Sequence, residues 1–270
     1  MLNSPTLMRM RVLPAPFEIL RVRCSTKALV FASVLASFLF VGALSAGTAS
    51  AQQRLSKRYP AGKNVRIELK NISGTIIVES WNRDEIKLTA TFESPKANIS
   101  PRQTGDALIV DVMADNRGRA DVGNVNFKLE VPVNSSVDLE TKRGQITVTN
   151  IHGDLVRAHV SLEGDIELSG ITAAQVYAQN TIGNIFFDGE FSRGGTYRFQ
   201  SSKGDITIRI PANSAFNIEA AAPNRKIALG EFWNNRLTNK DGRKIQGDVV
   251  DGRSKVVVTN FQGSITFLRR

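Results

Sequence analysis

A short pattern recurs along this chain with a period near 20 residues. Each copy holds an apolar alternation, a polar turn with a glycine, and a second apolar alternation. The anchors of the first alternation follow one another at steps of 19, 20, 21 and 19 residues. A fixed period of this size indicates one supersecondary unit stacked on itself, so the repeat determines the fold class. The anchors are Val137, Val156, Val176, Tyr197 and Phe216.

Apolar and polar residues alternate almost everywhere after residue 52. Ile146 and Val148 point to one side of a strand while Thr147 points to the other. Period two, with Gly, Ser, Asn and Thr at the breaks, predicts half-buried strands. A glycine suits each tight corner, because positive φ costs other residues more. We therefore expect an all-β, right-handed, β-helix-like solenoid with coils of about 20 residues. The corner glycines are Gly144, Gly164, Gly183 and Gly204.

Three further features define the organisation of the repeat. Trp81–Asp84 has turn chemistry and predicts a hairpin between two strands. Residues 221–254 are rich in Asn, Asp, Gly and Lys, so we expect one irregular excursion with a short hairpin that blunts one end of the stack. The final copy, from Val256 to Phe267, then closes the chain.

The first 51 residues are typical of a secretory signal. An apolar run from Ala28 to Leu44 follows Arg21, Arg23 and Lys27, and Ala49–Ser–Ala51 provides the small residues of a cleavage site. We expect residues 1–51 to be a signal peptide and residues 52–270 to be a single all-β domain. The alternative is an uncleaved membrane anchor, for which the run is short.

The composition of residues 52–270 limits the chemistry. This segment holds no cysteine, which excludes disulfides and thiolate sites. Its thirty basic and twenty-four acidic residues give a net charge of +6, and the charges are dispersed. An ordinary solvated surface explains this distribution of charge. The alternative is that the positive charge attracts anionic lipid headgroups or polysaccharide. Nucleic acid is not expected as a partner, because no aromatic and basic platform is present.

Candidate catalytic and metal-ligating residues are few. The only histidines, His152 and His159, fall on a turn and an outward strand position. The clustered acids Asp165 and Glu167 occupy an ordinary outward face of the repeat. We expect no enzyme activity, no cofactor and no metal site. Polar residues after the glycines predict a hydrogen-bonded turn ladder, with a calcium or sugar stripe as the alternative. They are Gln145, Asp154, Asp165, Asn184, Asp205 and Ser264.

The sequence resembles the bacterial DUF4097, or adhesin-like, domain family. The resemblance extends over roughly residues 60–268. It depends on the runs Asn71–Glu85 and Leu129–Val148 and on the Gly-Asp-Ile motifs at Gly164 and Gly204. It implies an all-β, solenoid-like domain in an exported or envelope-associated protein. No catalytic or ligand-binding residue is implied by it.

Taken together, these features predict an exported, non-enzymatic interaction or structural module of the cell envelope. Its partner would be an envelope component: a polysaccharide, an anionic surface or a protein. Trp233, Asn234 and Arg236 are the expected contact residues, because exposed aromatic and Arg side chains dominate contact energy. The alternative for Trp233 is a residue that covers the end of the stack. The alternative functions are a polysaccharide-active β-helix enzyme and an envelope-stress accessory protein.

Overall fold

The computed structural model describes residues 53–62, 64–119 and 121–270, so the expected signal peptide lies outside the described residues. These residues form an all-β structure in which the only helical pieces are one turn each. The elements in chain order are β1 (Gln53–Pro60), β2 (Arg66–Ser73), β3 (Ile76–Trp81), β4 (Glu85–Phe92), β5 (Arg102–Thr104), β6 (Ala107–Asp111), α2 (Val112–Asp115), β7 (Val125–Pro132), β8 (Ser136–Arg143), β9 (Ile146–Thr149), β10 (Leu155–Glu163), β11 (Ile166–Ile182), β12 (Ile185–Lys203), β13 (Ile206–Ile210), β14 (Phe216–Ala221), β15 (Ile227–Ala228), η1 (Gly230–Phe232), β16 (Leu237–Lys240), β17 (Lys244–Val249), β18 (Lys255–Asn260) and β19 (Ile265–Arg269).

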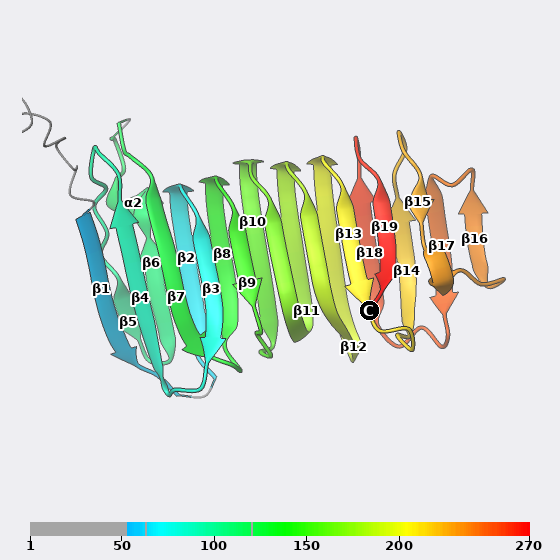
Figure 1. Ribbon diagram of the computed structural model, residues 1–270, viewed down its shortest axis with the longest axis horizontal. Helices are drawn as coiled ribbons and strands as arrows, with labels where there is room; N and C mark the ends of the chain where they lie inside the picture. Colours follow the sequence, from blue (N-terminus) through cyan, green and yellow to red (C-terminus); the bar gives the residue numbers. More distant parts are fainter. Residues whose placement is uncertain (1–52, 63, 120) are drawn as a thin grey trace, which may run out of the picture. The chain divides into compact units, whose positions relative to one another are not determined.

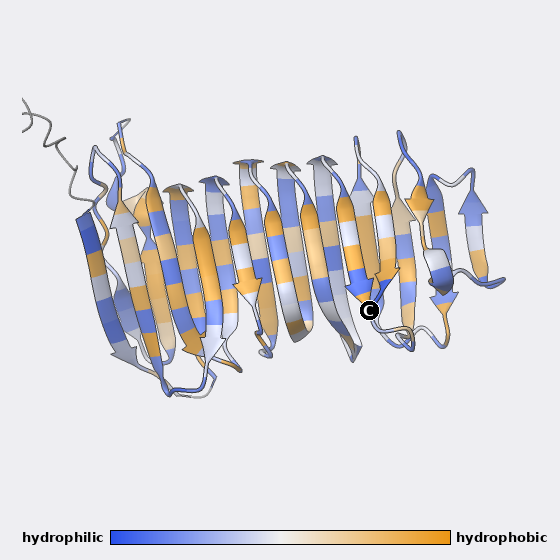
Figure 2. Ribbon diagram, in the orientation of Figure 1, coloured by the Kyte–Doolittle hydropathy of each residue, from blue (hydrophilic) through white to orange (hydrophobic). Residues whose placement is uncertain are grey.

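Each coil of the solenoid contributes one strand to each of two faces. In the coil from β8 to β9, the chain runs along the first face, turns at Gly144 and returns along the second face. The long strands β11 and β12 serve both faces, because each one bends midway and shifts register there. Along most strands the apolar side chains alternate with polar ones, as the stripes in Figure 2 show. The apolar set is buried between the two faces.

The coils stack in parallel and in register. Val156 pairs with Val137 and Val176, and Val176 pairs with Tyr197, so the coils are 19, 20 and 21 residues long. The second face keeps the same register through Ile146, Ile166, Ile185 and Ile206. The predicted β-solenoid-like stack of about 20-residue coils is therefore confirmed in this part of the chain.

The order of the rungs differs from the order of the sequence at both ends (Figure 1). The final copy does not close the stack, because β18 lies between β12 and β14 and β19 lies between β13 and β15. As a result, Tyr197 is in register with Val256, and Val256 with Ile218. The predicted anchor Phe216 instead pairs with Val249 of β17. The predicted anchor Phe216 is two residues from Ile218, which holds the anchor position in β14. The prediction that β14 follows β12 directly in the stack was wrong, because β18 lies between them.

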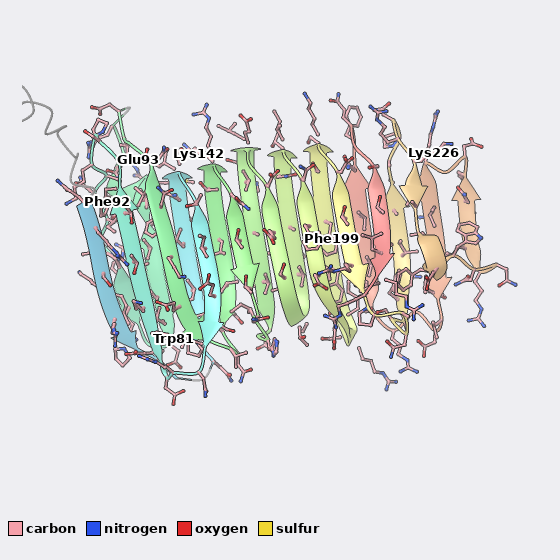
Figure 3. The ribbon with its side chains drawn as sticks, viewed as in Figure 1. Trp81, Phe92, Glu93, Lys142, Phe199 and Lys226 are labelled. Atoms are coloured by element: carbon pink, nitrogen blue, oxygen red, sulfur yellow. The ribbon has the colours of Figure 1, made fainter. Side chains whose placement is uncertain are left out.

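A similar insertion contradicts the hairpin predicted at Trp81–Asp84. This segment is a turn, yet β3 and β4 do not pair with each other. Instead β7 lies between them, parallel to β3 and antiparallel to β4. Turn chemistry reports a change of direction only, whereas a hairpin also requires the two strands to be neighbours. Figure 3 shows Trp81 at the edge of the stack opposite to Lys142 and Lys226.

Glycines at the turn between the faces form a column in which backbone touches backbone. Five of them adopt φ between +113° and +152°, a range that L-residues rarely occupy. A Cβ atom on Gly164 would clash with the carbonyl oxygen of Gly144, and one on Gly183 with that of Gly164. These five corners therefore need glycine for their own dihedral and for the rung beside them, whereas Gly263 is required only by the close approach of Gly204. The column consists of Gly74, Gly144, Gly164, Gly183, Gly204 and Gly263.

The two ends of the stack are finished differently. At the end formed by residues 221–254, β16 and β17 pair as an antiparallel hairpin, and Phe232 and Leu237 are buried. At the other end β1 pairs with β4, and Leu55 remains half-buried. Within the described segments, no helix is long and apolar enough to cross a membrane.

Replacing a column glycine should be far more damaging than replacing an unconstrained one. We expect Gly183→Ala to lower the free energy of unfolding by about 2 kcal/mol or more, because the new Cβ meets backbone that a neighbouring rung holds in place. Gly62→Ala is the matched control, since no atom lies within 4 Å of its Cβ position. Urea unfolding measures both; equal stability of the two variants would contradict the packing of the column.

Candidate functional site

The predicted ladder of polar residues after the corner glycines exists and has a structural role. Asp165 Oδ1 accepts a hydrogen bond from the backbone N–H of Asn184 at 2.6 Å. Asn184 Oδ1 in turn accepts from the N–H of Asp205 at 2.9 Å. Asp205 Oδ1 accepts from both the N–H and the hydroxyl of Ser264, at 2.8 and 2.7 Å. Each of these three side chains thus holds the backbone of the next rung, as predicted for a hydrogen-bonded turn ladder. Of the other predicted members, Ser264 is the donor to Asp205, whereas Gln145 and Asp154 do not join the ladder through their side chains.

Asp205 is the carboxylate most affected by this arrangement. The Ser264 hydroxyl, followed by the Ser264 backbone N–H, holds the pKa of Asp205 below its usual value of 3.8, and Arg225 adds a weaker effect in the same direction. Hydrogen bonds to the charged form favour that form. Asp205 is therefore a charged structural acceptor.

A second polar column, which was not predicted from the sequence, lies inside the same corner. Asn260, for example, is fully buried and donates to the carbonyl oxygens of Gly204 and Ser264 at 2.7 and 3.0 Å. The signal was present, because each member precedes a column glycine by three residues. These side chains satisfy buried carbonyl groups of the turn, so they stabilise the fold. The members are Asn71, Thr141, Asn180, Ser201 and Asn260.

The two histidines lie apart and have separate surroundings. The backbone N–H of the exposed His152 donates to the carbonyl oxygen of Val133. His159 Nδ1 is 3.8 Å from Glu140 Oε1 on the neighbouring rung. In the described part of the chain, no three His, Cys, Asp or Glu residues gather in a way that could hold a metal ion.

The expected contact residues occupy an exposed corner at the end of the stack. Trp233 follows η1 and is 48% exposed, whereas its neighbour Phe232 is the aromatic residue that covers the core. Asn234 accepts a hydrogen bond from the Arg236 N–H at 2.8 Å, and the Arg236 guanidinium donates to the Val250 carbonyl at 2.6 Å. An open hollow of about 520 Å³ lies here, lined by Asn234, Asn235, Arg236, Val250 and Asp251.

The first face carries an outward row of aromatic and basic side chains. The strand register places Arg157, Tyr177 and Arg198 on three consecutive rungs, which are about 4.8 Å apart. Arg157 also lies 3.4 Å from Asp138 on the preceding rung, and the Tyr177 hydroxyl donates to Gln175. One tyrosine thus lies between two arginines along the stack. The sequence predicted outward positions here but not the alignment, which depends on the register between coils.

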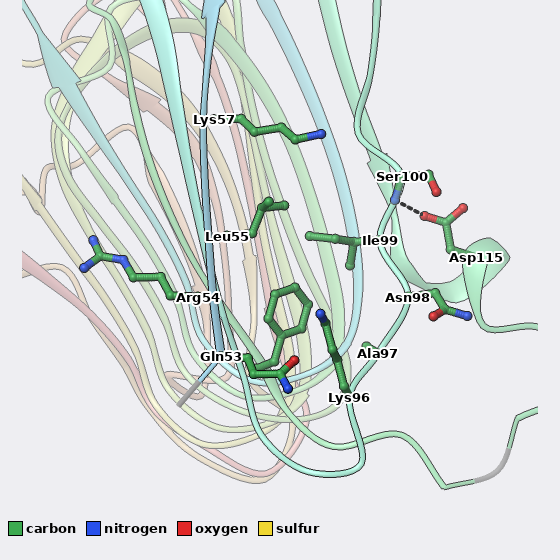
Figure 4. A pocket seen from close by; sticks show the side chains of 11 residues that line it. Gln53, Arg54, Leu55, Lys57, Lys96, Ala97, Asn98, Ile99, Ser100 and Asp115 are labelled. Carbon is green, nitrogen blue, oxygen red and sulfur yellow. Dashed lines mark hydrogen bonds between the residues drawn. The ribbon is translucent and has the colours of Figure 1, made fainter. Parts of the chain in front are cut away.

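An open groove of about 550 Å³ lies at the end of the stack where β1 is found (Figure 4). Leu55 and Ile99 point toward each other across it, and Phe92 also lines it. Lys57 and Lys96 extend over the opening. The segment 96–100 that forms one wall has no regular secondary structure, so strand periodicity gave no signal for this groove.

Comparisons with known proteins agree with this architecture. A family model described as Toastrack DUF4097 matches residues 46–267. A solved structure from Clostridium sporogenes, of a "putative cell adhesion protein", has a TM-score of 0.52 and 11% identity, and the match covers 81% of this chain and 100% of that one. A "putative adhesin" from Bacteroides fragilis matches with a TM-score of 0.30 and 11% identity, over 81% of this chain and 98% of that one. No curated protein matches the sequence.

The ladder provides its own test, because Asn184 performs with an amide the task that Asp205 performs with a carboxylate. Asp205→Ala should cost about 1 kcal/mol of stability at pH 7, since it removes the acceptor, whereas Asp205→Asn should cost less. Urea unfolding at pH 7 measures both variants, and an equal loss in the two would contradict the acceptor role.

The pH dependence follows from the lowered pKa of Asp205. Its contribution to stability is present above pH 3.8 and is lost as the pH falls through its folded-state pKa. The free energy of unfolding of Asp205→Asn should therefore depend less on pH below about 4 than that of the wild type. Thermal unfolding between pH 2 and 7 measures the difference; identical pH profiles would exclude the charged acceptor.

Proposed function

Because the chain belongs to the Toastrack DUF4097 family, we propose that it is a non-enzymatic module, exported to the cell envelope, that binds an anionic polysaccharide. The solenoid acts as a rigid support, and we expect its coils to be right-handed. Its flat first face is the binding surface. The name given to the Clostridium sporogenes protein of the same fold is compatible with a role in adhesion.

The row of Arg157, Tyr177 and Arg198 is the observation that carries this proposal. A guanidinium group pairs with carboxylate or sulfate in a fork geometry, and the phenol ring offers a surface on which a sugar ring can stack. The three side chains repeat along the stack at a fixed spacing, so a linear polymer can contact them together. Many weak contacts along one polymer combine into a strong one.

Trp233, Asn234 and Arg236 provide a second contact at the end of the same molecule. The indole is half exposed, and the hydrogen bonds of Asn234 and Arg236 fix the loop that follows it. An ordered loop loses little entropy on binding, which favours affinity. We propose that this corner extends the binding surface beyond the first face.

The competing function is a polysaccharide-cleaving enzyme with Asp165 or Asp205 as the catalytic acid. Both carboxylates accept hydrogen bonds from the backbone of the next rung. A glycosidase requires two carboxyl groups that flank the scissile bond in a cleft. Since these acids hold the turn ladder together, their geometry favours the non-enzymatic role.

Binding of alginate, a linear polymer of uronic acids, tests the proposed face. The double variant Arg157→Ala with Arg198→Ala should weaken binding roughly tenfold or more in isothermal calorimetry, and Trp233→Ala should weaken it to a smaller degree. The edge variants Lys142→Ala and Lys226→Ala should leave affinity nearly unchanged, although they also remove positive charge. Neutral dextran should not bind. Equal losses of affinity in the face and edge variants would show that binding depends only on net charge, and would overturn the proposed site.

Export predicts a defined mature N-terminus. If residues 1–51 are a cleaved signal peptide, the protein recovered from the producing cells should begin at Gln52. N-terminal sequencing or intact mass measures this directly. Recovery of the uncut chain in the membrane fraction would favour an anchor instead.

A further inference from the structure

The end of the stack at β1 differs from the opposite end in two respects. Its core is incompletely covered, because Leu55 and Ile99 are only half-buried while Phe232 and Leu237 at the opposite end are buried. Its open strand edge is also longer, since in the described part of the chain the eight-residue β1 pairs with β4 alone, whereas the four-residue β16 at the opposite end pairs with β17 alone. An eight-residue strand with one unpaired edge is a template for a further strand.

The groove between β1 and residues 96–100 combines an apolar floor with a basic rim. Leu55, Phe92 and Ile99 form the floor, and Lys96 lies 5.2 Å above the Phe92 ring. The rim is strongly basic. Its one acid, Asp115, already accepts a hydrogen bond from the Ser100 N–H at 2.7 Å. The cations that face the groove are Lys57 and Lys96, whereas the side chain of Arg54 points away from it on the other side of β1 (Figure 4).

We propose that this groove binds an extended peptide whose groove-facing positions, every second residue, carry both apolar and acidic side chains, and that the peptide pairs with the open edge of β1 as one more rung. Leu55 and Lys57 are two residues apart and therefore lie on the same side of β1. An apolar residue of the peptide would cover Leu55 and Ile99, and an acidic residue two positions away would approach Lys57 and Lys96. The inference deepens the proposed role as an interaction module, on which it rests, but it concerns a separate surface and a protein partner.

The open backbone edge favours a peptide over a lipid. An acyl chain in the groove would cover the N–H and C=O groups of β1 without offering hydrogen bonds, and an unsatisfied buried polar group costs about 1–3 kcal/mol. A peptide supplies the complementary groups. The acidic carboxylates then find their counter-charges at the rim.

The charges also disfavour a second copy of this chain at the same edge. Arg54, Lys57 and Arg58 lie on β1 itself, so pairing of β1 with β1 of another molecule would bring like charges together. Arg58 is engaged by Glu85 at 3.3 Å, and Lys57 is the cation of this strand that faces the groove. The same basic residues that oppose self-association therefore select an acidic partner.

Selection from a library of random dodecapeptides displayed on phage tests the proposed peptide chemistry directly. The purified protein is the bait, and the enriched peptides are synthesised and measured by fluorescence anisotropy. We expect enrichment of sequences in which an apolar and an acidic residue lie two positions apart. Lys57→Glu with Lys96→Glu should weaken the best peptide roughly tenfold or more, because two attractions become repulsions. Both lysines are exposed, so the variant should fold normally.

Three controls test whether peptide binding depends on this groove and on the open edge of β1. Lys240→Glu with Lys244→Glu, which makes the same charge change at the opposite end, should leave peptide affinity unchanged. N-methylation of alternate peptide amides should abolish binding, because it removes the hydrogen bonds to β1. Hydrogen exchange of the β1 amides should slow when the peptide is bound.

Several results would overturn the proposal. These are the absence of enriched peptides, enrichment of sequences without acids, equal affinity in both charge variants, and tight binding of phosphatidylglycerol vesicles in competition with the peptide. Alginate binding by the first face is measured on the same protein. Failure of the peptide selection with alginate binding intact would reject the groove alone, and the reverse result would reject the polysaccharide proposal alone.

Discussion

Contact between glycine backbones at one corner is the constraint on which the rest of this structure depends. The rungs approach so closely there that a Cβ atom on Gly164 or Gly183 would clash with the carbonyl oxygen of the preceding rung. This approach allows the parallel ladders on both faces to remain in register over many coils. The register in turn aligns the buried apolar columns, the polar columns at the corner and the outward rows. The positions of the surface groups therefore follow from a few residues without side chains.

The local pattern of the sequence predicts much of this architecture, because the positions of the strands and of the corners both depend on residues close together in the chain. Period-two alternation identifies the strands and their buried side, and the spacing of glycines identifies the coil. The order of the rungs is not a local property. Nothing in residues 255–269 indicates that β18 and β19 insert between earlier strands. Likewise, nothing in residues 125–132 indicates that β7 separates β3 from β4. Every copy has nearly the same pattern, so many neighbours satisfy its pairing equally well, and long-range packing at the ends decides among them.

The candidate sites differ in the same way: some depend on local sequence and others on which rungs are neighbours. The turn ladder through Asp205 was accessible from sequence, since it depends on residues next to recognisable glycines. The sequence left two roles open for Trp233, an exposed contact and a cover for the end of the stack, and the structure exposes it. The row of Arg157, Tyr177 and Arg198 required the register between coils. The groove at β1 required the path of an irregular segment, residues 96–100, for which neither periodicity nor turn chemistry is informative. Interaction surfaces on a repeat protein arise where coils are aligned or where the pattern stops.

The order of the rungs decides which strands are edges and which side chains share a row, and disulfide crosslinking measures it directly. Residues 52–270 contain no native cysteine, so introduced pairs report without interference. In the structure Arg198 is in register with Val257, and Val257 with Glu219. Arg198→Cys with Val257→Cys should therefore form a disulfide readily, because adjacent strands lie about 4.8 Å apart. Arg198→Cys with Glu219→Cys, two rungs apart, should not. Crosslinking of the second pair and not the first would show that the coils stack in sequence order, and would contradict the architecture described.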